Sequence, residues 1–187
     1  MFNDILYFIV HIGLSLLGIA FIFRAWLFAV RMPPFNPYSQ AVIQVTDWAV
    51  QPLKKLVSPR RYLDLPSLLA AWLCAVVYLV VSLLLLHQSI VAASQLVGLA
   101  LAGVLTVIKW GLNTALWLIL IQVILSWVNP TAPAMPLLQA LTRPIMEPIR
   151  RHLPATGAID FSPLIVLLIL QVANMVVQRL SMALGGL

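Results

Sequence analysis

The sequence predicts an all-α membrane protein with four transmembrane helices, arranged as two parallel repeats of helix, amphipathic cytoplasmic loop helix and helix. Of its 187 residues, 63% are hydrophobic and 9% are charged, whereas a soluble domain is about 45–50% apolar and about 25% charged. All 13 prolines fall within residues 33–66 and 130–163. Because proline disrupts helix interiors, the apolar blocks outside these windows are the expected membrane spans.

The two repeats are expected to meet near residue 90. In residues 1–90, we expect spans at about 5–30 and 65–86 and an amphipathic segment at about 39–57. In residues 91–187, the spans are expected at about 98–128 and 162–184, and the amphipathic segment at about 135–153. The third span is long enough to be divided near Lys109, which would give five spans. No proline or glycine pair marks a turn there, so we favour one long helix.

Basic residues indicate the topology. They gather in the two proline-rich loops, whereas residues 87–95 contain no lysine or arginine. The positive-inside rule then places both loops in the cytoplasm and both termini on the opposite side, as four spans require. We therefore read the net charge of +6 as a sign of topology, and we expect no nucleic-acid partner.

The two halves repeat at a constant offset of 96 residues. Prolines, a threonine, a basic pair and an aspartate recur at this offset: Pro37 and Pro133, Thr46 and Thr142, Pro52 and Pro148, Lys54-Lys55 and Arg150-Arg151, Asp64 and Asp160. In the first loop, polar residues from Gln40 to Lys55 recur at helical spacing, with an apolar series that includes Val45 and Leu56 on the other side. This pattern predicts an amphipathic helix on the cytoplasmic leaflet.

The loop motifs resemble those of the YggT family of bacterial membrane proteins, and the resemblance extends over the whole chain as two tandem copies. The second copy reads TRPIMEPIRRHLP over residues 142–154 and ATGAIDFSP over residues 155–163. The first copy keeps NPYS over residues 36–39 and PLKK over residues 52–55. It departs from the second by having Trp48 in place of Pro144 and Arg61 in place of Gly157.

This resemblance implies a bacterial inner-membrane protein without known enzymatic activity or cofactor. Relatives are associated with tolerance of osmotic or ionic stress. Plastid relatives are associated with cofactor attachment to a membrane cytochrome and with nucleoid or division organisation. The family thus implies roles in membrane organisation without specifying a molecular mechanism.

Several polar residues are candidates for function. The basic pairs Lys54-Lys55 and Arg150-Arg151 could bind anionic head groups or acidic partners, although topology anchoring alone is the simpler interpretation. Arg24 lies inside the first expected span, where a charge suggests function; we expect it instead to extend toward the cytoplasmic head groups. Lys109, in the third expected span, is likewise either a functional charge inside the membrane or a side chain that extends to the head groups.

Other polar residues have mainly structural interpretations. Asp64 and Asp160 precede spans, so we expect them to cap helix N-termini rather than bind an ion. The sequence leaves open a further alternative, in which they pair with Arg24 or with the basic pairs. In the last span, Gln171 and Asn174 are expected to hydrogen-bond across helices rather than line a polar pathway. The repeat residues Pro37, Pro52, Pro133, Pro148 and Gly157 are expected to shape the loops.

No catalytic or metal-binding pattern is present in the sequence. His11, His87 and His152 have no metal-ligand spacing, and Cys74 is the only cysteine. We therefore predict a non-enzymatic scaffold or assembly factor that contacts anionic lipid, other membrane proteins or a second copy of itself. The alternative is a small cation channel or transporter that acts as an oligomer.

Overall fold

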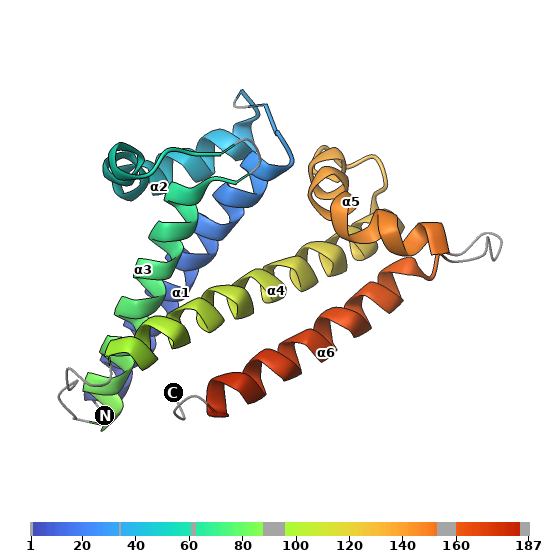
Figure 1. Ribbon diagram of the computed structural model, residues 1–187. Coiled ribbons are helices and arrows are strands. Elements are labelled where there is room, and N and C mark those ends of the chain that lie inside the picture. The colour runs from blue at the N-terminus through green and yellow to red at the C-terminus, as the bar shows by residue number, and fades with distance from the viewer. Residues whose placement is uncertain (1, 34, 61–62, 88–95, 153–159, 184–187) are drawn as a thin grey trace. The chain divides into compact units, whose positions relative to one another are not determined.

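The computed structural model describes residues 2–33, 35–60, 63–87, 96–152 and 160–183. Over these residues the chain is helical and contains no strand (Figure 1). The helices are α1 (Phe2–Ala29), α2 (Pro37–Leu56), α3 (Leu65–Ser82) with a π-helical turn η1 (Leu83–His87), α4 (Leu96–Val128), α5 (Met135–His152) and α6 (Ser162–Ala183).

Four of these helices, α1, α3, α4 and α6, are long and apolar enough to cross a membrane. They coincide with the four predicted spans, and α2 and α5 coincide with the two predicted loop helices. Helix α4 runs unbroken through Lys109 over 33 residues, so the alternative of a break at that position is wrong. The helical class and the presence of four helices of spanning length are therefore confirmed.

Prolines mark the starts of several helices. Pro37 is the first residue of α2, and the Asn36 side chain caps the same end by accepting a hydrogen bond from the Tyr38 amide at 3.0 Å. Pro66 and Pro163 are the second residues of α3 and α6. The remaining prolines of the repeat motif lie in the turn before α5 (Pro133) and inside α2 and α5 (Pro52, Pro144 and Pro148).

The chain divides into two compact units. Unit 1 comprises Met1–Gly111 and Val177–Leu187, and unit 2 comprises Leu112–Val176. The division falls inside α4 and α6 and does not follow the sequence repeats, which meet near residue 90. The first half of α4 belongs to unit 1 because it contacts α1 and α3.

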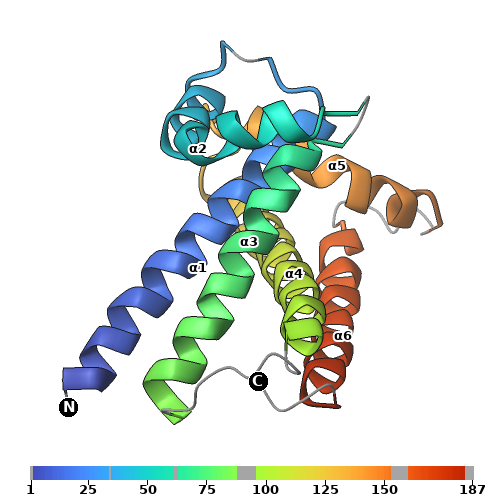
Figure 2. The ribbon, with the colours of Figure 1, turned by 60° about the vertical axis from the view of Figure 1, so that its left-hand side comes forward.

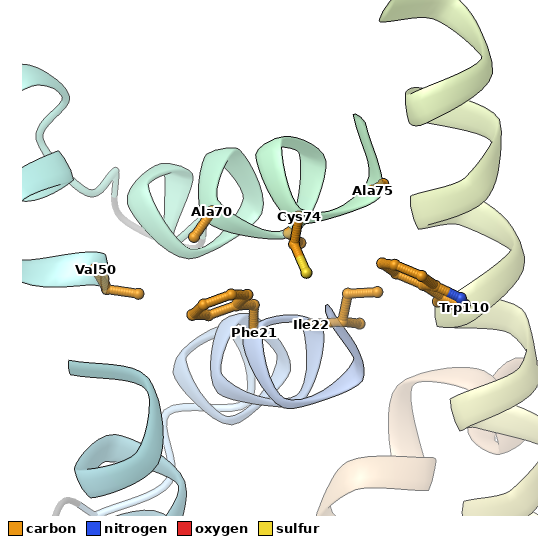
Figure 3. Close-up of a cluster of buried hydrophobic side chains, with 8 residues drawn as sticks. Phe21, Ile22, Val50, Ala70, Cys74, Ala75 and Trp110 are labelled. Atoms are coloured by element: carbon orange, nitrogen blue, oxygen red, sulfur yellow. The ribbon is translucent and has the colours of Figure 1, made fainter. Parts of the chain in front are cut away.

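In unit 1, α1 and α3 lie side by side and α2 lies across one end of the pair (Figures 1 and 2). Small residues on α3, including Ala71 and Ala75, are fully buried and let the helices approach closely. Figure 3 shows Phe21 and Ile22 of α1 facing α3, with Val50 of α2 and Trp110 of α4 in the same cluster.

Trp110 fixes the first half of α4 within unit 1. Its indole ring packs over Gly18 of α1 so closely that an added Cβ would lie 2.1 Å from the ring atom Cζ3. The ring also meets Tyr78 of α3 in an edge-to-face arrangement, with centroids 5.6 Å apart. A second contact joins Trp72 of α3, whose Nε1 donates to the Ala100 carbonyl of α4 at 3.0 Å.

In unit 2, α5 buries an apolar face while its basic end is exposed. Leu138, Leu141 and Met146 of α5 are buried, as are Ile119 of α4 and Val166 of α6. Thr142 is a buried polar residue of the same helix. A polar contact of Thr142 ties this helix to α4.

We predict that Gly18→Ala lowers the stability of unit 1 by about 1–3 kcal/mol, because the new methyl group would overlap the Trp110 ring in a packed core. Thermal unfolding of the detergent-solubilised protein, followed by circular dichroism and tryptophan fluorescence, measures the effect. Gly13→Ala is the matched control, since a Cβ there meets nothing within 4 Å and replacing a helical glycine gains up to about 1 kcal/mol. Equal melting temperatures for the two variants would contradict this account.

Candidate functional site

A buried arginine connects α1 to α2. Arg24 is only 7% exposed. Its Nη1 donates to Thr46 Oγ1 at 2.9 Å, and its Nη2 donates to Asp47 Oδ1 at 2.9 Å. The expectation that Arg24 extends to the head groups is therefore wrong: α2 brings a hydroxyl and a carboxylate to it, which removes the reason to reach for water.

The start of α3 contributes a second carboxylate. Asp64 is 4% exposed, and its Oδ2 lies 3.9 Å from Arg24 Nε. The same oxygen accepts a hydrogen bond from the Ser67 hydroxyl. Asp64 makes no side-chain hydrogen bond to the backbone of α3, so the capping role expected for it is not found. Its carboxylate instead faces the guanidinium and the nearby hydroxyl.

Asp47 is held in its charged form. The hydrogen bond from Arg24 lowers the pKa of the Asp47 carboxyl, which partial burial would otherwise raise. Gln51, one helical turn away, also lowers the pKa by donating to Asp47 Oδ2 at 2.6 Å. The cluster of Arg24, Thr46, Asp47, Asp64 and Ser67, here called the Arg24 cluster, thus joins three helices through one cation and two carboxylates.

Unit 2 has a partial counterpart of the Arg24 cluster. Thr142 of α5, at the repeat position of Thr46, is buried and its hydroxyl forms a hydrogen bond to the side-chain oxygen of Gln122 in α4. The Thr46 and Thr142 hydroxyls also bond the carbonyls one turn back, at 2.6 Å and 2.9 Å. Each short helix is therefore tied to the preceding long helix through a buried threonine, by a cation in unit 1 and by an amide in unit 2.

Asp160 behaves differently from Asp64. Its Oδ1 accepts a hydrogen bond from the Ser162 amide at 2.9 Å, which is the contact of a helix cap. Its Oδ2 pairs with Arg150 Nη2 at 2.6 Å. Partial burial raises the pKa of Asp160, but the hydrogen bonds from Ser162 and Arg150 outweigh it, and the pKa lies below its usual value.

The two basic pairs also differ. Arg150 pairs with Asp160, and Arg151 pairs with Glu147 at 3.3 Å between Nη2 and Oε1. In the described part of the chain, no ion pair is found for Lys54 or Lys55, and both are exposed. The first pair is thus the more available of the two for an external anion.

Helix α2 also exposes an apolar row. Val45, Trp48 and Leu56 are 57%, 68% and 78% exposed. The residues that α2 buries are Ser39, Thr46 and Val50. The expected division into one polar and one apolar face is therefore wrong in detail, because the Arg24 cluster draws Thr46 and Asp47 inward and leaves this apolar row outside.

The other residues predicted as candidates lie outside the Arg24 cluster. Asn174 Nδ2 donates to Asn113 Oδ1 at 3.1 Å, an interhelical bond of the kind expected. Gln171 and Lys109 are exposed. Gly157 lies outside the described residues.

Two cavities adjoin these groups. The first, in unit 1, has a volume of about 490 Å³ and is lined by cations, by Asp64 and Ser39, and by apolar side chains of α1 and α2. The second, in unit 2, has a volume of about 530 Å³ and lies between Gln122 and the polar side of α5, including Arg143 and Glu147. Over the described residues, no group of three His, Cys, Asp or Glu side chains could hold a metal ion.

Sequence reasoning identified Arg24 and Asp64 but missed Ser39, Thr46 and Asp47 as their neighbours. The recurrence of threonine at positions 46 and 142 was the available signal. A small polar residue repeated within an otherwise apolar helix face indicates a position where a buried group needs a partner.

Comparison with known proteins shows similarity over almost the whole chain. A family model described as CCB3/YggT matches residues 3–85 and 101–181. Uncharacterized protein YggT of Escherichia coli (strain K12) is 31% identical over 181 residues, which cover 96% of this chain and 93% of the relative. An uncharacterized protein in the proC 3′ region of Vibrio alginolyticus is 34% identical over 82% of each chain. No solved structure matches the chain.

We predict that Thr46→Val destabilises the protein by about 1–3 kcal/mol, because it leaves the buried Arg24 Nη1 without its acceptor. Thr106→Val is the matched control, since the Thr106 hydroxyl bonds only the Ala102 carbonyl of its own helix among the contacts described. Thermal unfolding in detergent compares the two. A loss in Thr106→Val as large as that in Thr46→Val would show that the Arg24 contact contributes nothing specific.

We also predict an acid-dependent contribution from Asp47. Its pKa is lower in the folded protein, so the charged carboxylate stabilises the fold above the ordinary value of 3.8, and this contribution is lost as pH falls through the folded pKa. The melting temperature of the native protein should exceed that of Asp47→Asn at pH 6, and the gap should close toward pH 2. A gap that is independent of pH would contradict the assignment.

Proposed function

The chain belongs to the CCB3/YggT family, and we propose that it is a non-enzymatic scaffold or assembly factor of the bacterial inner membrane. In this proposal α1, α3, α4 and α6 anchor the chain in the bilayer. Helices α2 and α5 lie at the cytoplasmic surface, where they bind anionic head groups and partner membrane proteins. Roles in osmotic or ionic stress tolerance, or in the organisation of membrane complexes, would follow from those contacts.

The observation that carries this proposal is the attachment of α2 to a spanning-length helix. Arg24 holds Thr46 and Asp47, which lie in the middle of α2. With its buried side fixed in this way, α2 presents Val45, Trp48 and Leu56 outward beside the exposed lysine pair. A tryptophan at the boundary of the hydrocarbon region and a basic end near anionic head groups suit an interfacial helix.

The contacts of the intramembrane polar groups favour scaffolding over ion transport. Arg24 is buried and bonded to α2, and Asn174 is bonded to Asn113. These side chains hold helices together, and such interhelical bonds are the common use of polar residues in membranes. A transport pathway would need polar groups that face water along a span.

The lipid contact is tested with Lys55→Gln/Arg151→Gln. This double variant removes one exposed cation from each loop helix and leaves the Arg150–Asp160 pair intact. Extraction of the full chain into polymer nanodiscs, followed by lipid analysis, should show phosphatidylglycerol enrichment around the native protein and a lower enrichment in the variant. Lys109→Gln/Arg179→Gln carries the same change of charge on α4 and α6 and should retain the enrichment. Equal enrichment in all three proteins would contradict an anionic-lipid role for α2 and α5.

The scaffold role predicts a specific neighbour at the exposed row of α2. A photo-crosslinking amino acid at position 48, introduced in cells, should give a discrete adduct with a membrane protein or with a second copy of the chain. The same amino acid at position 77, an exposed position of α3, is the control. Potassium or sodium flux in proteoliposomes that depends on the protein would overturn the scaffold proposal and favour the channel alternative.

A further inference from the structure

The cavity of unit 1 lies where the α1–α3 pair meets its loop helix. Its lining comes from the last turns of α1, the start of α2, Lys54 near the end of α2, and Asp64 just before α3. If α1 and α3 span the bilayer, this position corresponds to the boundary between hydrocarbon and head groups. Leu27, Phe28 and Ile43 give the cavity an apolar side, and Arg31 and Lys54 give it a basic side.

Two buried polar atoms in the lining lack partners. Asp64 Oδ1 and Ser39 Oγ have no hydrogen-bond partner among the described residues, although Ser39 is only 3% exposed and Asp64 4%. A buried carboxylate oxygen without a donor is costly in a folded protein. Because both residues line the same cavity, a molecule inside it that carries N–H donors would satisfy them together.

The charges of the lining restrict that molecule further. Three cations, Arg24, Arg31 and Lys54, line the cavity beside the Asp64 carboxylate. A simple anion could form ion pairs with Arg31 and Lys54 but would leave Asp64 Oδ1 without a hydrogen-bond donor. A simple cation would suit Asp64 but would meet three like charges.

A ligand that carries both an ammonium and a phosphate group satisfies both requirements. We propose that the cavity binds a phosphoethanolamine group, with its ammonium on Asp64 Oδ1 and Ser39 Oγ and its phosphate on Arg31 and Lys54. The source favoured by the apolar lining and by the position of the cavity is phosphatidylethanolamine of the bilayer. A soluble phosphoethanolamine would share the same chemistry. The inference depends on α1 and α3 spanning the membrane and not on the scaffold role.

Arg31 can be replaced by glycine without straining the backbone. It follows α1 with a φ of 54°, while its amide bonds the Phe28 carbonyl and the Met32 amide bonds the Leu27 carbonyl. This is the Schellman arrangement, in which the left-handed position usually holds glycine. Arg31→Gly should therefore remove a phosphate-binding side chain without weakening the end of the helix.

The test is native mass spectrometry of the delipidated full chain, titrated with lipids of identical acyl chains. We expect phosphatidylethanolamine to bind about tenfold more tightly than phosphatidylcholine, because the trimethylated ammonium of the latter offers no N–H group to Asp64. Both lipids carry no net charge, so the comparison is independent of the anionic-lipid test on Lys55 and Arg151. Equal affinity for the two lipids in the native protein would overturn the proposal.

The variants identify the groups responsible. Asp64→Asn and Ser39→Ala should each reduce the preference for phosphatidylethanolamine, and Ser39→Ala remains informative if Asp64→Asn fails to fold. Arg31→Gly should weaken both lipids about tenfold. Arg60→Gln removes an exposed cation that is not among the described lining residues, and it should bind as the native protein does. A preference that survives Ser39→Ala and Asp64→Asn alike would refute the assignment.

A competition experiment shows whether the bound phosphoethanolamine group belongs to a lipid or to a soluble molecule. If the ligand is the lipid, soluble phosphoethanolamine should displace phosphatidylethanolamine only at concentrations far above that of the lipid, because it lacks acyl chains for the apolar lining. Displacement at equal concentration would support the same site with a soluble ligand. Failure to displace the lipid at any concentration, together with binding unchanged in Arg31→Gly, would place the lipid elsewhere on the chain.

Discussion

Unit 1 is organised around one charge placed inside an apolar helix. A guanidinium in a spanning helix is costly unless it is paired and hydrogen-bonded, and Arg24 obtains both from α2 through Asp47 and Thr46. This contact fixes which side of α2 faces the α1–α3 pair. The outward row of Trp48 and Leu56, and the cavity beneath the loop helix, are consequences of that choice.

The helices could be predicted from the sequence because they depend on local properties. Apolar block lengths gave the spans, and the proline windows gave the loop helices to within a few residues of Pro37–Leu56 and Met135–His152. The partners of Arg24 could not be predicted in this way. Helical periodicity placed Asp47 with the solvent-facing glutamines, whereas the structure turns it inward because a buried cation elsewhere in the chain outweighs the local pattern. For Asp64 the sequence left two interpretations open, a helix cap or a pair with Arg24, and the structure shows the carboxylate beside the guanidinium.

The two halves share the order of their helices along the chain and differ in the polar contacts of those helices. A buried threonine joins the loop helix to the preceding long helix in both, but its partner is Arg24 in the first half and Gln122 in the second. The first basic pair is exposed, and the second is engaged by Asp160 and Glu147. Asp160 caps its helix, whereas Asp64 leaves its own helix uncapped and turns into the Arg24 cluster. Asp64 therefore keeps one oxygen without a hydrogen-bond partner, whereas both oxygens of the matching Asp160 accept hydrogen bonds.

The different polar contacts of Asp64 and Asp160 bear on what the Arg24 cluster does. A buried ion pair contributes little net stability compared with a well-packed apolar alternative, so added stability alone does not account for joining these helices through the Arg24 cluster. Its directional bonds specify the orientation of α2, which an apolar contact would specify less sharply. The incomplete satisfaction of Asp64 and Ser39 is a cost that the second half avoids at the matching Asp160. Two such atoms that line the same cavity are typical of a binding site whose remaining hydrogen bonds are made by its ligand.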